Sequence, residues 1–155
     1  MAWTQPKTWT NEPLVAADLN THLRDNLNAL KDSPSYSYQS ASSYSTTSTT
    51  PVLVDSSNMN ETITLESAGN VLLGFNGTVT NTGGNLVYFA LQRNGANILQ
   101  SMVNSSAGGI YENVAMEILL ENLPAGDHTF AVKWWVQANT GALSAGKNQF
   151  YIQGV

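Results

Sequence analysis

The side chains that could take part in catalysis are few, and they stand far apart in the sequence. His128 directly follows Asp127, and a carboxylate beside an imidazole is the start of a proton relay. Such a relay needs an activated nucleophile, and the sequence contains no G-x-S-x-G motif. The second histidine, His22, is remote from the first, so no H-x-x-x-H or H-x-H metal-binding spacing exists. The histidines therefore predict neither a catalytic site nor a metal site.

Acidic residues offer two other candidates. Glu112 and Glu117 fall in one expected strand, an odd number of positions apart, so they should project from opposite faces. One strand therefore does not supply the paired carboxylates of a glycosidase, although tertiary folding could still assemble such a pair. Oxygen ligands for calcium occur within residues 55–61, without the EF-hand spacing, and a solvated turn is the preferred interpretation. We predict that the protein is not an enzyme and uses no cofactor and no metal.

The composition describes a neutral, polar surface around a core of ordinary size. The chain has 155 residues, of which 42% are hydrophobic and only 11% charged, and its formal net charge is −5. The six basic residues do not cluster, which predicts no nucleic-acid partner and no membrane partner. There is no cysteine, so disulfide bonds and thiolate metal sites are excluded. The first residues lack the pattern of a secretion signal, and we expect synthesis in a cytoplasm.

Residues 1–32 are predicted to form an extended arm followed by one short α-helix. The arm carries Trp3 and Trp9 with few aliphatic residues, so it cannot form a core alone. Its tryptophans are either anchors that fill pockets on a partner or side chains that fold back onto the chain's own sandwich.

The helix is expected over residues 14–31, where leucines recur on one face. These leucines are Leu19, Leu23, Leu27 and Leu30. About two heptads are too few for a coiled coil that is stable alone. The stripe must therefore pack on the sandwich, on sister helices or on a larger partner. Together with Trp3 and Trp9, these leucines are the predicted particle-docking residues.

Residues 33–50 form a low-complexity Ser/Thr/Tyr segment between the helix and the sandwich. Tyr36, Tyr38 and Tyr44 keep even spacing, which allows a strand with tyrosines on one face. The alternatives are a flexible linker and an edge strand. We prefer a partly ordered linker that leads into an edge strand.

Residues 51–155 show alternating apolar and polar positions in many short runs, with turn residues between them. Asn94-Gly95 is the strongest hairpin signal, because this dipeptide suits a type I′ turn. No helical pattern separates the runs. The sequence thus predicts a mainly β domain, an antiparallel sandwich or barrel.

Three of these strands carry adjacent large aromatic residues, and neighbours in a strand point to opposite faces. Only one member of each pair can enter the core, and the sequence does not say which. The other member should lie on an outer face, where a bare aromatic ring usually marks an interface. The predicted oligomer-interface residues are Tyr88, Trp134, Trp135 and Tyr151.

The segment at residues 8–31 resembles a leader at the N-terminus of many tailed-phage and prophage virion proteins. The matching residues are V-A-A-x-L-N at 15–20 and H-L-R-D-N-L-x-A-L at 22–30, together with Trp9. The resemblance implies that this segment attaches the protein to a phage particle.

Residues 46–155 resemble the jelly roll of the tumour-necrosis-factor and complement-head type. The matching segments are VLLGFNGTV at 71–79, the Asn94-Gly95 hairpin, LENLPAGDHTFAVKWW at 120–135 and the final NQFYIQGV. The resemblance implies an antiparallel jelly-roll β-sandwich that forms a homotrimer.

Together the two resemblances imply a non-enzymatic virion structural protein, either a capsid decoration protein or a short head fibre. Its partner would be the major capsid protein, or a tail or baseplate protein, of the particle. The alternative is a tail-fibre or baseplate module that recognises a glycan or protein on the host surface.

Overall fold

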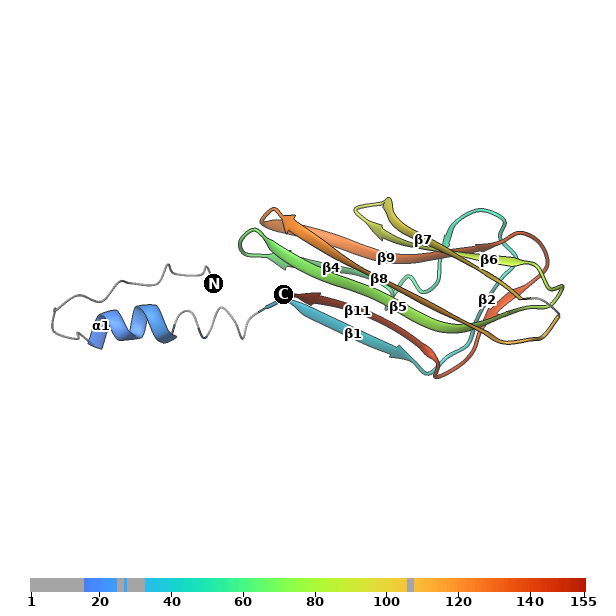
Figure 1. The fold of residues 1–155 in the computed structure, drawn as a ribbon, viewed down its shortest axis with the longest axis horizontal. Coiled ribbons are helices and arrows are strands. Elements are labelled where there is room, and N and C mark those ends of the chain that lie inside the picture. The colour runs from blue at the N-terminus through green and yellow to red at the C-terminus, as the bar shows by residue number, and fades with distance from the viewer. Residues whose placement is uncertain (1–15, 25–26, 28–32, 106–107) are drawn as a thin grey trace.

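Most of the chain forms strands, which build two antiparallel sheets packed face to face (Figure 1). The computed structural model describes residues 16–24, 27, 33–105 and 108–155. The first sheet contains β1 (Ser35–Ser40), β2 (Tyr44–Thr46), β5 (Gly69–Asn81), β8 (Glu112–Leu123), β10 (Gly141–Leu143) and β11 (Asn148–Gly154). The second contains β3 (Val52–Leu53), β4 (Asn60–Leu65), β6 (Leu86–Arg93), β7 (Ala96–Asn104) and β9 (Gly126–Val136). The predicted antiparallel sandwich is confirmed.

Neighbouring strands in each sheet come from distant parts of the sequence. In the first sheet β5 is central, with β8 on one side and with β11 and β10 on the other. Beyond these lie β1, next to β11, and β2, next to β10. In the second sheet β9 lies between β6 on one side and β3 and β4 on the other, and β7 is outermost. Each pairing is antiparallel, as a jelly roll requires.

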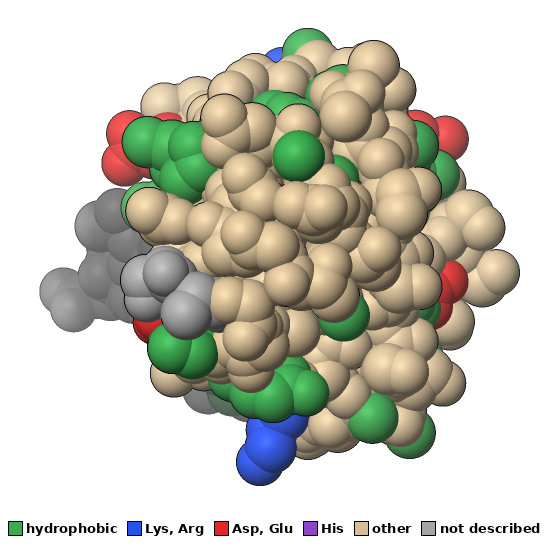
Figure 2. Space-filling model, turned by 90° about the vertical axis from the view of Figure 1, so that its right-hand side faces the viewer, with side chains coloured by type: hydrophobic (Ala, Val, Ile, Leu, Met, Phe, Trp, Pro, Cys, Tyr) green, Lys and Arg blue, Asp and Glu red, His purple; other side chains and the backbone are tan. Residues whose placement is uncertain are grey.

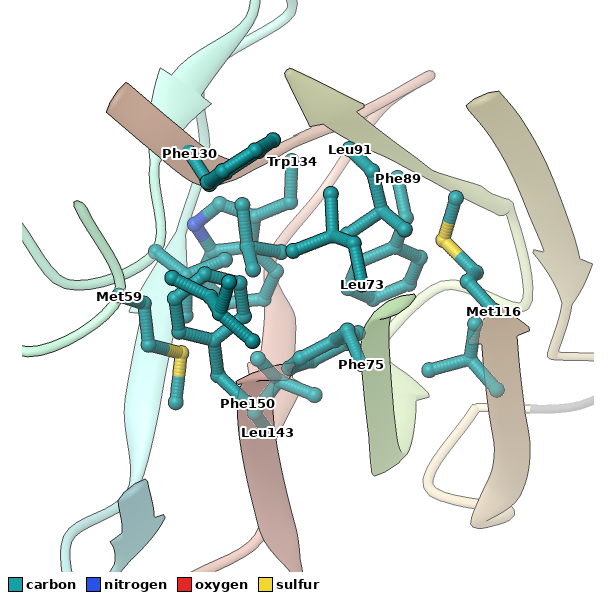
Figure 3. Packing of buried hydrophobic residues seen from close by; sticks show 14 of the residues in the cluster. Met59, Leu73, Phe75, Phe89, Leu91, Met116, Phe130, Trp134, Leu143 and Phe150 are labelled. Atoms are coloured by element: carbon teal, nitrogen blue, oxygen red, sulfur yellow. The ribbon is translucent and has the colours of Figure 1, made fainter. Parts of the chain in front are cut away.

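The core fills the space between the sheets, and the longer strands contribute side chains to it from alternate positions (Figure 3). Phe75 of the first sheet stacks on Phe89 of the second, with ring centroids 5.6 Å apart. Phe89 also contacts Trp134 of the neighbouring strand at 6.2 Å. Aromatic contacts of this kind hold the two sheets in a fixed relation.

The adjacent aromatic residues separate between core and surface, as the alternation predicted. Trp134 is only 2% exposed, whereas Trp135 is half-buried on the outer face of the second sheet. Phe89 and Phe150 are likewise buried, and their neighbours Tyr88 and Tyr151 face outward. The prediction of Trp134 as an oligomer-interface residue is wrong, because its own chain already covers the indole.

The Ser/Thr/Tyr segment belongs to the sandwich, so the edge-strand interpretation is correct for β1 and β2. Their tyrosines turn toward the core, and two of them reach across to the β3–β4 turn. The hydroxyl of Tyr36 donates to the carbonyl of Asn58 at 2.9 Å, and the hydroxyl of Tyr44 donates to Asp55 at 2.7 Å. The sandwich therefore begins at Ser35, earlier than the predicted boundary at residue 51.

The hairpin between β6 and β7 has the predicted turn. Asn94 and Gly95 have φ values of 50° and 83°, as the central residues of a type I′ turn require. This turn lies at the end of the sandwich where the chain enters β1, since β6 runs toward it.

A short helix, α1 (Ala16–Leu19), continues into a wider π-type turn, η1 (Asn20–Arg24). Figure 1 shows it beyond the end of the sandwich where β1 begins. Leu23 and Leu27 are 53% and 56% exposed. The side chain of Leu19 and all of Trp3, Trp9 and Leu30 lie outside the described residues. Within the described part of the chain, no helix has the length and apolar character needed to cross a membrane.

Candidate functional site

The outer face of the first sheet carries a side-chain arrangement centred on Tyr151. Tyr151 of β11 pairs with Gly74 of β5, which in turn pairs with Glu117 of β8. The Tyr151 ring lies across Gly74, and its hydroxyl donates a hydrogen bond to the Glu117 carboxylate. The three residues thus form one row across three strands, with the tyrosine as a ridge.

Gly74 makes this ridge possible because it has no side chain. A Cβ atom built at this position would overlap the Cζ and hydroxyl oxygen of Tyr151. A glycine inside a strand often marks a close approach of another group, and here that group is the Tyr151 ring. The site therefore depends on a contact between residues far apart in the chain.

Burial and the acidic neighbour keep the Tyr151 phenol protonated. Loss of water around the ring, followed by the hydrogen bond and charge of Glu117, raises the pKa of Tyr151 to about 12. All of these causes disfavour the phenolate. At neutral pH the phenol is therefore a hydrogen-bond donor, and a role as general base is disfavoured.

The rows on either side of the ridge are apolar or neutral. Toward the end near α1, Leu72 pairs with Leu119, and Leu119 is 47% exposed. In the other direction the side chain of Asn76 donates to that of Gln149 at 3.4 Å, beside Ala115. Glu117 is the sole charged residue in these three rows.

Two shallow hollows flank the ridge. One, of about 480 Å³, lies over β1 and β11 and is lined by Tyr151 with small and amide residues of both strands. The other, of about 300 Å³, lies over β5 and β8 between Tyr151, Ala115 and Glu117. A ridge between two hollows is a shape that a matching protein surface can fit, and it offers no enclosed chamber for a reaction.

The other predicted interface residues lie elsewhere. Tyr88 and Trp135 project from the outer face of the second sheet, where their rings are nearly parallel at 9° and 5.2 Å apart. Tyr151 is on the opposite side of the sandwich. The four predicted residues therefore do not form one surface. Gly74 and Glu117 complete the row of Tyr151, although they were not identified from the sequence as members of this site. The alternation of inward and outward positions on β5 and β8 places both residues on the outer face. Only the register between the strands shows that they lie beside Tyr151.

The candidates for acid–base chemistry are separated. His128 is buried, with Nε2 2.9 Å from the carbonyl oxygen of Pro124, whereas Asp127 points outward and accepts from the Thr64 hydroxyl at 2.6 Å. They do not form a relay. Among the described residues, no group of three or more His, Cys, Asp or Glu side chains is placed to hold a metal ion.

Asp55 has a structural role in the β3–β4 turn. Its carboxylate accepts hydrogen bonds from the amides of Ser57 and Asn58, from the Asn58 side chain and from Tyr44. Burial alone raises the pKa of Asp55, but these hydrogen bonds together outweigh it and hold the pKa below its usual value. The carboxylate joins the turn to the edge strand β2.

Comparison with solved structures identifies the fold. A structure described as Eiger TNF from S. frugiperda superposes with a TM-score of 0.54 at 12% sequence identity, over 79% of this chain and 92% of that one. The chain has a TNF-like jelly-roll fold. At this identity the similarity concerns the fold alone. No protein-family model and no curated protein matches the sequence.

Proposed function

We propose that this chain is a non-enzymatic structural protein of a tailed-phage virion, a capsid decoration protein or short head fibre. In this proposal the sandwiches form a homotrimer through the outer face of the first sheet, and residues 1–32 attach the trimer to the particle. The observation that carries the trimer is the Tyr151 ridge with its two hollows and its nearly uncharged rows. The leader resemblance at residues 8–31 is the support for the virion.

A cyclic trimer needs two different surfaces on each subunit, because its contacts are head to tail. The first sheet offers both. The Tyr151 ridge with its hollow over β1 and β11 forms one surface, and β8 with the exposed Leu119 forms the other. Association buries apolar side chains and neutral amides there, and Glu117 is already bonded to Tyr151. Desolvation of these neutral groups costs little, and the hydrogen bond from Tyr151 offsets part of the cost of covering the charged Glu117.

The state of assembly tests the trimer. We expect the full chain to sediment as a trimer, and Leu119→Lys to shift it to monomer, because a lysine charge would be buried in the contact. Met102→Lys is the matched control, since Met102 is an exposed apolar residue on the outer face of the second sheet. A trimer that tolerates Leu119→Lys as well as Met102→Lys contradicts the proposed contact.

Particle attachment has a separate test. Removal of residues 1–32 should leave the sandwich folded and trimeric, because β1 begins at Ser35. The truncated protein should then fail to join particles that lack the wild-type protein. Incorporation at the wild-type level would contradict the role of the arm. The major capsid protein, or a tail or baseplate protein, is the proposed partner.

A second candidate function is receptor binding by a tail-fibre or baseplate module. The observation in its favour is the aromatic pair Tyr88–Trp135, which lies outside the proposed trimer contact. Binding of the isolated protein to host cells would support this candidate.

A further inference from the structure

Three large side chains form one row across the outer face of the second sheet. Trp135 of β9 pairs with Tyr88 of β6, and Tyr88 pairs with Met102 of β7. The two rings stack at 5.2 Å, and Met102 is 63% exposed. We call these three residues the aromatic platform. It lies on the opposite side of the sandwich from Tyr151.

The polar atoms of the platform are available to a ligand. In the part of the chain that the structure describes, neither the Tyr88 hydroxyl nor the Trp135 indole N–H has a hydrogen-bond partner, and neither is buried. The neighbouring rows add three exposed amide side chains without partners among the described residues. These are Gln100, Asn104 and Gln137. An apolar centre is thus surrounded by groups that can donate and accept hydrogen bonds.

Charge contributes little to the surface around the platform. Lys133, opposite Ala90 in the adjacent row, is the charged residue next to the platform. Figure 2 shows that the end of the sandwich farther from α1 displays mainly neutral atoms, with charged side chains at its margins. The net charge of −5 adds a general repulsion toward polyanions.

The three platform residues alone expose less area than a stable contact with a second copy of the chain needs. A large aromatic side chain offers roughly 150–250 Å² when fully accessible, and two of the three residues are mostly covered. The accessible area of the three is therefore at most about 400 Å², whereas a stable protein contact needs about 800 Å² per partner. A small ligand with a compact apolar face matches this area better.

We propose that the aromatic platform binds an uncharged oligosaccharide. The C–H face of a pyranose ring is apolar, and its hydroxyls project around the rim. That pattern matches apolar contacts with Tyr88, Trp135 and Met102, surrounded by the free amides. The platform lies in the half of the sandwich away from α1, since β6 begins at that end (Figure 1). It gives the receptor-binding candidate a site and a ligand class, and it does not depend on the trimer contact.

Saturation-transfer NMR with the full chain tests this proposal. The probes are gluco-, galacto-, manno- and N-acetylglucosamine-configured tetrasaccharides without charged groups, together with one uronate-bearing tetrasaccharide. We expect transfer to at least one uncharged probe. Trp135→Ala and Met102→Ala should each weaken that binding at least about ten-fold, which corresponds to roughly 1.4 kcal/mol. Because Met102 is largely exposed, its variant should fold normally.

Tyr111→Ala is the matched control, because Tyr111 is an exposed tyrosine that precedes β8 of the first sheet. It should bind as the wild type does. The proposal is overturned if no uncharged probe binds, if the uronate probe alone binds, or if the platform variants bind as well as Tyr111→Ala. It is also overturned if Trp135→Ala changes the oligomeric state, since a second copy would then occupy the platform. A failure in sugar binding leaves the Leu119→Lys result, and hence the trimer proposal, unaffected.

Discussion

The hydroxyl of Tyr151 reaches the carboxylate of Glu117 across a strand that lies between them, and it can do so because that strand carries Gly74 at the crossing point. The ring of Tyr151 thus takes the place of a side chain on β5. The contact between the ring and Gly74 determines how far the ridge projects from the first sheet. A single methyl group added at residue 74 would therefore displace the ring.

Gly74→Ala should lower the free energy of unfolding by about 1–3 kcal/mol, because the added methyl group must displace the Tyr151 ring. Urea unfolding of the two proteins measures the difference. Gly69→Ala is the control, since the atom nearest to a Cβ at Gly69 is a backbone oxygen 3.9 Å away. We expect that control to change stability by less than about 0.5 kcal/mol. Equal effects at the two glycines would contradict the packing described.

Glu117→Gln should lower the pKa of Tyr151 from about 12 toward the ordinary value of 10.0, because the acceptor charge is lost. In the wild type the folded state holds the phenol proton more tightly than the unfolded state does. The resulting stability is complete below pH 10.0 and is lost as the pH rises through about 12. Tyrosinate absorbance against pH measures the shift, with Tyr151→Phe to identify the signal. An unchanged titration would argue against the hydrogen bond.

Asp55→Asn should destabilise the protein near neutral pH by about 1–2 kcal/mol, because the Tyr44 hydroxyl and the Asn58 amide lose a charged acceptor. The pKa of Asp55 is lower in the folded state, so its contribution is present above the ordinary value of 3.8 and lost as the pH falls below it. Wild type and variant should therefore converge in acid. Unfolding curves at several pH values test this, and Glu66→Gln, at an exposed carboxylate, should show no such convergence.

Trp134→Ala should lower the free energy of unfolding by about 3–5 kcal/mol, because it leaves a cavity between the sheets. Trp135→Ala removes a half-buried ring and its stacking with Tyr88, so we expect a loss of about 0.5–1.5 kcal/mol. Thermal and urea unfolding measure the loss of stability in each of the two variants. The reverse order of effects would mean that the strand presents its other face to the core.

The alternation of apolar residues was sufficient to predict the sandwich, and the Asn94–Gly95 dipeptide was sufficient to predict its hairpin. Both signals are local, since a strand or a tight turn is determined by residues next to one another. The strand β1 was harder to separate from a linker. Its exposed positions hold Ser35, Ser37 and Gln39, which fit solvent exposure in either state, and only Tyr36 and Tyr38 between them indicate the face that turns inward.

The candidate site was predicted only through Tyr151, because the other members depend on pairing between distant strands. The sequence around residues 74 and 117 contains no signal that these residues lie beside residue 151. The sequence could not show which of Trp134 and Trp135 enters the core for the same reason, since this depends on which face of β9 packs against the opposite sheet. Composition and periodicity determine which residues share one face of a strand. The register between strands determines which residues of the neighbouring strands lie beside them.

The amide of Gly154 donates to the carbonyl of Pro34 at 2.8 Å, so the last strand and the first strand are joined at one end of the sandwich. A peptide fused after Val155 would therefore emerge beside Pro34, next to the start of β1. Display at the opposite end needs an insertion, and the β5–β6 turn at residues 82–85 lies there, between two long strands. Engineering of this scaffold for surface presentation should use that turn.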